Sequence, residues 1–288
     1  MDFPVYLSIG SLRLHPHWVF ETLAYAAGFR VYLWLRRRNG DALDDASRWW
    51  VIAAAAMGAV AGSKILYWFE DPRLTLEHWS DLAFLMGGKT IVGALAGALF
   101  AVEAMKLRLG ITQRTGDLFA VPLCVGIAIG RIGCFLTGLD DHTFGIATNL
   151  PWGIDFGDGL ARHPTQLFEC VFAILLGSFL HARMRRPYVP GDIFKMFMVA
   201  YFAFRLLVDL LKPEVPIFAG LSSIQFVCIA MLLYFGPDIL RWTGVLPAPA
   251  GSRMNREIRP SGARRASPQA STILLCLIFV GKIFGKRE

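Results

Sequence analysis

The chain has 288 residues, of which 55% are hydrophobic and only 18% are charged. An ordinary soluble domain has roughly 25% charged residues, so this composition favours a protein that lies in lipid. The net charge of +7 does not indicate a nucleic-acid-binding protein, because the basic residues form short clusters between long apolar stretches rather than one polar face. We therefore expect membrane lipid, and no nucleic acid, as a partner.

Seven stretches of the chain have the length and apolar character of transmembrane helices, which need about 20 mostly apolar residues. They are residues 17–35, 49–69, 82–104, 117–138, 165–182, 191–211 and 216–240. Residues 1–16 lack the basic start and the small-residue cleavage site of a signal peptide, so no cleavable leader is expected there. The expected fold class is all-α, a polytopic membrane bundle of about seven transmembrane helices within residues 1–245.

The loops between these spans alternate in charge. Lys and Arg follow spans one, three and five, at Arg36, Arg37, Arg38, Arg48, Lys106, Arg108, Arg114, Arg183, Arg185 and Arg186. The intervening loops, 70–81, 139–164 and 212–215, are poor in basic residues. Because basic loops stay on the cytoplasmic side of a membrane, the N-terminus is predicted outside and the C-terminus inside.

Residues 246–288 are expected to form a basic tail outside the helical domain. Pro247 to Gln269 is rich in Pro, Ser, Gly and Arg and shows no periodicity, which is typical of disorder. The apolar run from Ile273 to Phe284 is too short to span a membrane and is interrupted by Lys282. We expect this run to lie at the membrane interface.

Charged residues occur inside the predicted spans, where each costs at least about 2.5 kcal/mol at a helix centre. They are Glu21, Arg30, Lys64, Lys89, Arg131, Glu169, Lys195, Arg205 and Asp209. Arg30 and Lys195 lie near cytoplasmic ends and can extend to water. Lys64 is ambiguous, whereas Arg131, Lys89 and Arg205 together predict a positively charged interior.

Two explanations of this interior stay open. Arg205 and Asp209 are spaced i, i+4 and could simply neutralise each other. Alternatively, Arg131, Arg205 and Lys89 surround the phosphate of an anionic lipid headgroup, which a planar guanidinium can bind with two hydrogen bonds. Glu169, just inside the fifth span, is expected to form a salt bridge with a buried arginine.

No metal or cofactor is expected. The triplet Asp140, Asp141 and His142 has metal-ligand chemistry, but adjacent residues rarely converge on one ion and no second cluster matches it in the sequence. The five cysteines show no C-x-x-C spacing and predict neither a disulfide framework nor a zinc site. Close helix packing is expected instead at the small-x-x-x-small glycines Gly93 and Gly97 and around Gly126, Gly130 and Gly133.

Several motifs together resemble the core of the prolipoprotein diacylglyceryl transferase family. They are G-R-I-G-C-F-L at 130–136, P-W-G at 151–153, R-H-P-T-Q-L-F-E at 162–169, and Y-F-A-F-R at 201–205 followed by Asp209. Fainter similarities occur in the right order at S-I-G-S-L-R-L-H-P-H-W near the N-terminus and at G-G-K-T-I-V-G-A-L-A-G in the third span. The resemblance covers roughly residues 5–240.

The resemblance implies a seven-helix enzyme of the bacterial inner membrane. Such an enzyme transfers the diacylglyceryl group of phosphatidylglycerol to the lipobox cysteine thiol in the signal peptide of a prelipoprotein. It further implies that Arg131 binds the lipid headgroup and that Tyr201 and Arg205 belong to the catalytic site. Lys89 is expected to be catalytic or to bind phosphate, and His163, Glu169, Asp140 and Asp209 are expected to support the site.

The chain also departs from the family pattern. The family has a histidine where this chain has Lys89 and an asparagine where it has Cys134, and the family's acidic residue after the G-R-I-G motif is displaced to Asp140 or Asp141. A desolvated lysine has a lowered pKa and could accept a thiol proton, or Lys89 could anchor phosphate. Two other functions therefore stay open: a divergent lipid transferase with another acceptor or lipid, and a non-catalytic lipid transporter or lipid-binding protein.

Overall fold

A computed structural model of the chain describes residues 3–247, and the predicted tail 246–288 lies almost wholly outside these residues. The described part is mostly helical. Its helices are α1 (Pro16–Asn39), α2 (Asp45–Trp68), α3 (Pro72–Glu77), α4 (Leu82–Gly87), α5 (Ile91–Arg108), α6 (Asp117–Thr137), the 3₁₀ helix η1 (Gly138–Asp141), α7 (Thr165–Met184), α8 (Asp192–Asp209), α9 (Ser223–Tyr234) and α10 (Gly236–Trp242). Two small antiparallel sheets pair β1 (Leu7–Ile9) with β2 (Leu12–Leu14) and β3 (Ile154–Asp155) with β4 (Ala161–Arg162).

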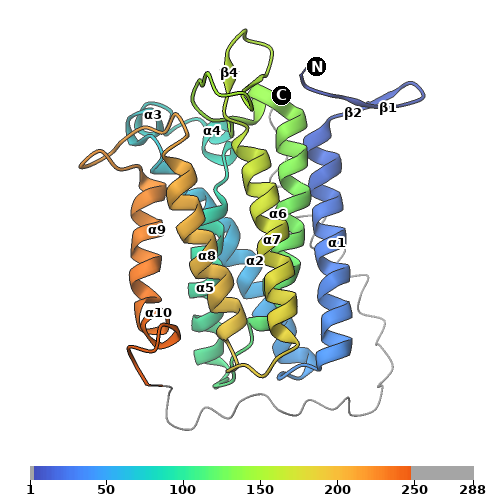
Figure 1. Cartoon of the computed structure of the whole chain (residues 1–288), viewed down its shortest axis with the longest axis vertical. Helices are drawn as coiled ribbons and strands as arrows, with labels where there is room; N and C mark the ends of the chain where they lie inside the picture. The colour runs from blue at the N-terminus through green and yellow to red at the C-terminus, as the bar shows by residue number, and fades with distance from the viewer. Residues whose placement is uncertain (1–2, 248–288) are drawn as a thin grey trace.

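The long helices run side by side as one bundle, with both small sheets at the same end (Figure 1). Helix α2 packs on α5, α6 packs on both α1 and α7, and α8 packs on α9. One cluster of apolar side chains joins these helices, and at its centre Phe197, Met198, Tyr201 and Phe202 of α8 have no exposed surface. The inner face of α8 is therefore fully enclosed, and the polar side chains on that face must find partners inside the protein.

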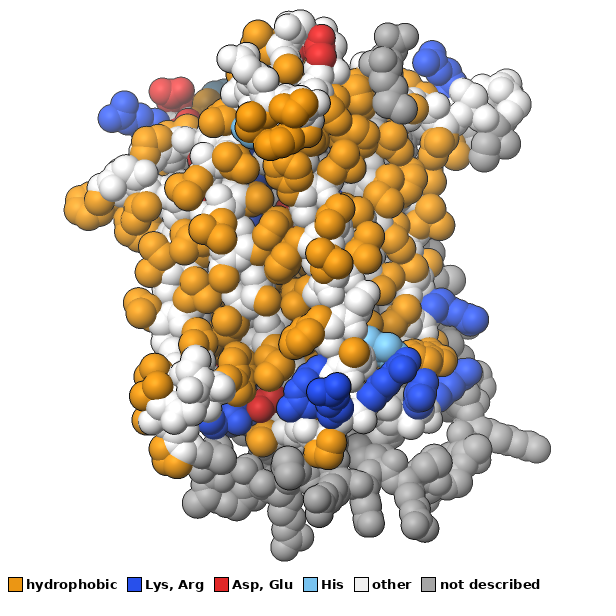
Figure 2. Space-filling model, in the orientation of Figure 1, with side chains coloured by type: hydrophobic (Ala, Val, Ile, Leu, Met, Phe, Trp, Pro, Cys, Tyr) orange, Lys and Arg blue, Asp and Glu red, His pale blue; other side chains and the backbone are white. Residues whose placement is uncertain are grey.

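The outer surface has the character of a membrane protein. Figure 2 shows hydrophobic side chains along the length of the helices and a belt of Lys and Arg at the lower end. Arg36, Arg37 and Arg38 lie in the last turn of α1, and Arg183 lies in the last turn of α7. Within residues 3–247, three helical segments, Asp45–Trp68, Asp117–Asp141 and Thr165–Met184, are long and apolar enough to cross a membrane, and the bent pair α9 and α10 would make a fourth.

The predicted third span, 82–104, is wrong as a continuous helix. Its residues form the short helix α4 and then α5, separated by Gly88, Lys89 and Thr90 in extended conformation. The buried Lys64 of α2 stabilises this break, because its Nζ donates to the carbonyl oxygens of Met86, Gly87 and Gly88 at 2.5, 3.3 and 2.7 Å. A lysine at the C-terminal end of a helix satisfies free carbonyl groups and complements the helix dipole. Lys64 is thus a structural residue.

The predicted last span, 216–240, also differs from the structure. Helix α9 begins only at Ser223, where Ser222 and Gln225 form a capping box, and the chain bends by 55° between α9 and α10. A capping box satisfies the first free N–H groups of a helix and therefore fixes where it starts.

The predicted glycine contacts are confirmed between α2 and α5. A Cβ atom at Gly97 would lie 2.2 Å from the Gly58 carbonyl oxygen, and one at Gly93 would lie 2.3 Å from that of Gly62. The two backbones therefore touch at a distance that only glycine permits. In α6 a Cβ at Gly133 would lie 2.6 Å from the Phe20 side chain, so close packing is found there. The expected close packing at Gly126 and Gly130 is wrong, because a Cβ at Gly126 would make only an ordinary contact of 3.6 Å and one at Gly130 would meet nothing within 4 Å.

Candidate functional site

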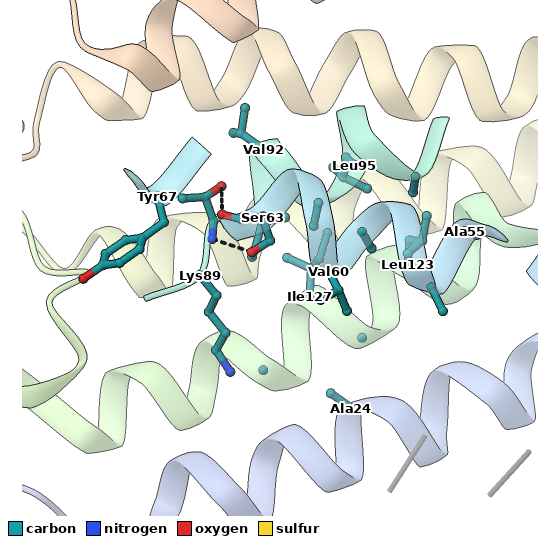
Figure 3. Close-up of a pocket in the computed structure, with 18 of the residues that line it drawn as sticks. Ala24, Ala55, Val60, Ser63, Tyr67, Lys89, Val92, Leu95, Leu123 and Ile127 are labelled. Atoms are coloured by element: carbon teal, nitrogen blue, oxygen red, sulfur yellow. Dashed lines mark hydrogen bonds between the residues drawn. The ribbon is translucent and has the colours of Figure 1, made fainter. Parts of the chain in front are cut away.

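A cavity of about 2140 Å³ lies between the helices of the described part of the chain. Its lining includes apolar side chains of α2, α5 and α6 along most of its length. Figure 3 shows this wall, with Ala55, Val60, Val92, Leu95, Leu123 and Ile127 on one side of Lys89. An apolar wall of this kind suits hydrocarbon chains, because it removes apolar surface from water.

Arg131 of α6 contributes a buried positive charge to the cavity lining. Its Nη2 lies 2.9 Å from Oε2 of Glu169 on α7, which confirms the expected salt bridge between Glu169 and a buried arginine. The other carboxylate oxygen of Glu169 accepts a hydrogen bond of 2.6 Å from the Tyr201 hydroxyl. Glu169 therefore orients Arg131, and Tyr201 orients Glu169.

Arg205 of α8 is a second buried guanidinium in the cavity lining. Its Nη2 lies 3.3 Å from Asp209, one turn later, so the expected i, i+4 pair forms. Asp209 is also held by the Ser222 hydroxyl at 2.6 Å. Asp209 does not occupy the whole guanidinium of Arg205, because Arg205 Nη1 has no hydrogen-bond partner among residues 3–247. Within the same residues, Arg131 Nε also has no partner. Both arginines thus keep donors for an anion.

Lys89 enters the cavity from the break between α4 and α5 (Figure 3). The break is anchored on α2, since the Thr90 N–H donates to the Ser63 hydroxyl at 2.8 Å and the Thr90 hydroxyl caps α5. Lys89 Nζ lies 2.8 Å from Glu21 Oε1 on α1. The Lys89 side chain is therefore partly exposed in the cavity, and its ammonium group is paired with a carboxylate.

The four predicted supporting residues and the predicted catalytic residue Tyr201 occupy three kinds of position. Asp140 is exposed at the cavity, whereas Glu169, Tyr201 and Asp209 lie behind its lining. His163 lies outside the lining; it is buried beside the Phe168 ring, with 6.3 Å between ring centroids. Tyr201 lies outside the cavity lining and donates to Glu169, and its expected catalytic role stays a prediction.

Three charged residues of the cavity lining were not predicted from the sequence, because they lie in loops outside the predicted spans. They are Glu70, Lys212 and Glu214. Burial, followed by the charge of Arg205, lowers the pKa of the Lys212 ammonium to about 7. Burial and the carboxylate of Glu214 raise the pKa of Glu70 to about 8. All three line the cavity, and Glu214 lies 3.9 Å from Arg205. The sequence signal that could have indicated Lys212 is its position three residues after Asp209, next to the motif that contains Arg205.

One further group of the cavity lining combines residues far apart in the sequence. A ring nitrogen of His17, the Cys134 thiol and a carboxylate oxygen of Asp141 all lie within 4.8 Å of one another. His17 Nδ1 contacts Asp141 Oδ1 at 2.9 Å. Of the two adjacent aspartates, Asp141 is the one that belongs to this group. Among the described residues, His17, Cys134 and Asp141 are close enough together to hold a metal ion.

The fold and the site define a class of protein: a bundle with membrane-length apolar helices that encloses a cavity with apolar walls and buried guanidinium groups. The chain belongs to the prolipoprotein diacylglyceryl transferase family, whose model matches residues 4–236. This match confirms the resemblance found in the motifs.

Individual relatives carry the same description. The chain is 34% identical over 252 residues to the phosphatidylglycerol–prolipoprotein diacylglyceryl transferase of Bordetella parapertussis, covering 80% of this chain and 91% of the relative. It is 32% identical to the protein of that name from Methylobacillus flagellatus, covering 77% and 87%, and 29% identical to the one from Nitratidesulfovibrio vulgaris, covering 80% and 90%.

Proposed function

We propose that this chain transfers the diacylglyceryl group of phosphatidylglycerol to the lipobox cysteine thiol of prelipoproteins. The observation that carries the proposal is the pair of buried arginines, Arg131 and Arg205, each with a free donor in a cavity with apolar walls. One end of such a cavity suits a phosphate and the walls suit two acyl chains. Family membership and the names of the relatives supply the reaction.

The chemistry assigns a task to each group. The thiolate sulfur attacks the glyceryl carbon that bears the phosphate ester, a carbon–sulfur bond forms, and the carbon–oxygen bond breaks with its electron pair leaving on glycerol phosphate. Arg131 and Arg205 stabilise the charge on the departing phosphate, an effect that is strongest in a site with little water. Lys212 would add a positive charge while it is protonated, and Lys89, which lines the same cavity, would contact phosphate or the acceptor.

Glu169, Tyr201 and Asp209 act through the arginines in this proposal. Glu169 pairs with Arg131, Asp209 pairs with Arg205, and Tyr201 donates to Glu169, all at distances below 3.5 Å. Fixed orientation matters because preorganised donors need no rearrangement as charge develops.

The same proposal includes the setting of the protein. We infer seven spans, with the bent pair α9 and α10 as the last and the broken α4–α5 segment as the third. The basic ends of α1 and α7 face the cytoplasm, so the N-terminus is outside in a bacterial inner membrane. Phosphatidylglycerol and a signal peptide would then reach the cavity from the membrane and its outer face.

Expression of the chain in bacteria depleted of their own diacylglyceryl transferase tests the proposal. We expect a reporter lipoprotein to gain the mass of one diacylglyceryl group. If the reporter gains no mass while the chain is inserted and stable, the transfer proposal is wrong. A divergent lipid transferase or a lipid-binding protein then becomes the better account, and chemical transfer to other thiol or hydroxyl acceptors separates the two.

A further inference from the structure

The group formed by His17, Cys134 and Asp141 has the composition of a zinc site. Thiolate, imidazole and carboxylate are all ligands of Zn²⁺, and a thiolate disfavours the hard ions Mg²⁺ and Ca²⁺. With zinc–ligand bonds of 2.0–2.3 Å, tetrahedral ligand atoms lie roughly 3.3–3.8 Å apart. The three atoms already lie within 4.8 Å of one another, so shifts of under about 1 Å would complete the arrangement.

Each of the three side chains also has a polar neighbour that could support a metal ligand. Glu21 Oε2 lies 3.6 Å from His17 Nε2, the ring nitrogen opposite the one that faces Asp141, so a small shift would bring the two within hydrogen-bond distance. The Thr143 hydroxyl donates to Asp141 Oδ2 at 2.5 Å. A metal-bound histidine usually donates its other ring N–H to a carboxylate, and bound carboxylates are themselves hydrogen-bonded.

The third ligand, Cys134, is supported by Arg131, whose Nη1 lies 3.7 Å from the sulfur. Glu169 pairs with this guanidinium at 2.9 Å and so offsets part of its repulsion of a cation. The Cys134 thiolate and the Asp141 carboxylate carry two negative charges, which match the charge of Zn²⁺. The loaded site would be electrically neutral, as a partly buried site requires.

We propose that His17, Cys134 and Asp141 bind one Zn²⁺ ion whose fourth position faces the cavity. All three residues line that cavity, and three protein ligands with one open position are typical of catalytic rather than structural zinc. Binding displaces the Cys134 proton to water. The site lies beside Arg131, the residue that the proposed function places at the lipid phosphate.

The role of the ion rests on the proposed function. The acceptor thiol takes the fourth position as a thiolate and gives its proton to water, because a coordinated thiol is deprotonated. The sulfur then forms its bond to the glyceryl carbon, the bond from that carbon to the phosphate oxygen breaks, and the thioether leaves the metal. Zinc is neither oxidised nor reduced. The ion would thus supply the thiolate in a chain that has Lys89 at the position of the family's histidine.

Metal content of the purified full-length chain tests the site directly. The chain is stripped with a chelator, exposed to zinc chloride and passed through a desalting column. We expect one zinc per chain, and at least about a tenfold loss of affinity in His17→Phe and in Cys134→Ser, since even supporting residues contribute 10–100-fold. Cys170→Ser is the matched control, because Cys170 is a buried cysteine outside the cavity lining. Equal zinc retention in all four chains would overturn the site.

Cobalt provides a readout that does not depend on activity. Co²⁺ in the site should give a sulfur-to-cobalt absorption band that is present in the wild type and in Cys170→Ser and absent in Cys134→Ser. Failure of the wild-type chain to bind either metal while it remains folded overturns the proposal.

Transfer to a lipobox peptide then separates the site from the proposed function. If the chain binds zinc, and if transfer falls at least tenfold on chelation and recovers when zinc is added, both the zinc site and the proposed function are supported. Zinc bound without any transfer overturns the proposed function and leaves the site standing. Equal transfer by the stripped and loaded chains overturns the role of the ion and leaves the transfer reaction in place.

Discussion

The Glu169 carboxylate lies 2.9 Å from the Arg131 guanidinium, and both side chains are almost fully buried. Removing one member of such a pair leaves an uncompensated charge inside the protein, which costs about 3–5 kcal/mol. The pair therefore has a structural role, while the free Nε of Arg131 is available for a functional one.

Arg131→Ala is expected to lower turnover by at least about 100-fold, the loss typical for one group that stabilises developing charge. The measurement is transfer from phosphatidylglycerol to a lipobox peptide by the purified variant. The double variant Arg131→Ala with Glu169→Gln removes the unpaired carboxylate and should regain thermal stability without activity. Full activity in either folded variant would show that Arg131 does not bind the headgroup.

Tyr201→Phe removes the hydrogen bond to Glu169 and should lower stability by about 1.5–3 kcal/mol, the usual contribution of a hydrogen bond to a charged group. Because Tyr201 lies behind the cavity lining, kcat should fall less than for Arg131→Ala, with KM for the lipid little changed. A loss as large as that of Arg131→Ala at unchanged stability would instead place the hydroxyl in the reaction itself.

Lys89→His should preserve activity, since the side chain at this position enters the cavity from an anchored break and the family resemblance puts a histidine there. Initial rates of the variant and of Lys89→Met, a control without a titratable group, provide the comparison. A Lys89→His chain that folds but has no more activity than Lys89→Met would assign Lys89 another role.

Binding of the anionic lipid should weaken as pH rises from 7 to 9. Lys212, with a pKa of about 7, is positive below that value and neutral above it. Glu70, with a pKa of about 8, is neutral below that value and negative above it. Both changes make the cavity less positive at higher pH, so KM for phosphatidylglycerol should increase.

Lys212→Arg tests the origin of this pH dependence, because arginine stays charged throughout the range. The rise of KM should become shallower in Lys212→Arg and shallower again when Glu70→Gln is added. An unchanged profile in the double variant would mean that neither group faces the bound lipid.

The contact between α2 and α5 should tolerate no side chain at its centre. Gly62→Val is expected to prevent folding or to lower Tm strongly, because even a Cβ at Gly62 would lie 2.3 Å from the Gly93 carbonyl oxygen. Gly126→Ala in α6 is the matched control, since its Cβ would lie 3.6 Å from Ala24 O, an ordinary contact. This control should keep or slightly raise Tm.

Much of this protein is determined by its sequence. Apolar stretches of membrane length predict the long helices, because burial in lipid requires about 20 apolar residues in a row whatever they pack against. The glycine spacing predicts the close contact of Gly93 and Gly97 with α2, and the cost of a charge in a span predicts that Glu169 pairs with an arginine. These inferences succeed because each depends on a local pattern or on one strong energetic constraint.

Other features were decided only by tertiary structure. The break at Lys89 exists because Lys64, 25 residues earlier, satisfies the carbonyl groups of α4, and nothing in the apolar pattern of residues 82–104 reveals that distant donor. His17 joins Cys134 and Asp141 because α1 packs on α6, which no spacing in the sequence could indicate. Hydropathy acts on each residue separately, whereas a site requires side chains from several helices to converge, and that convergence depends on how the helices pack.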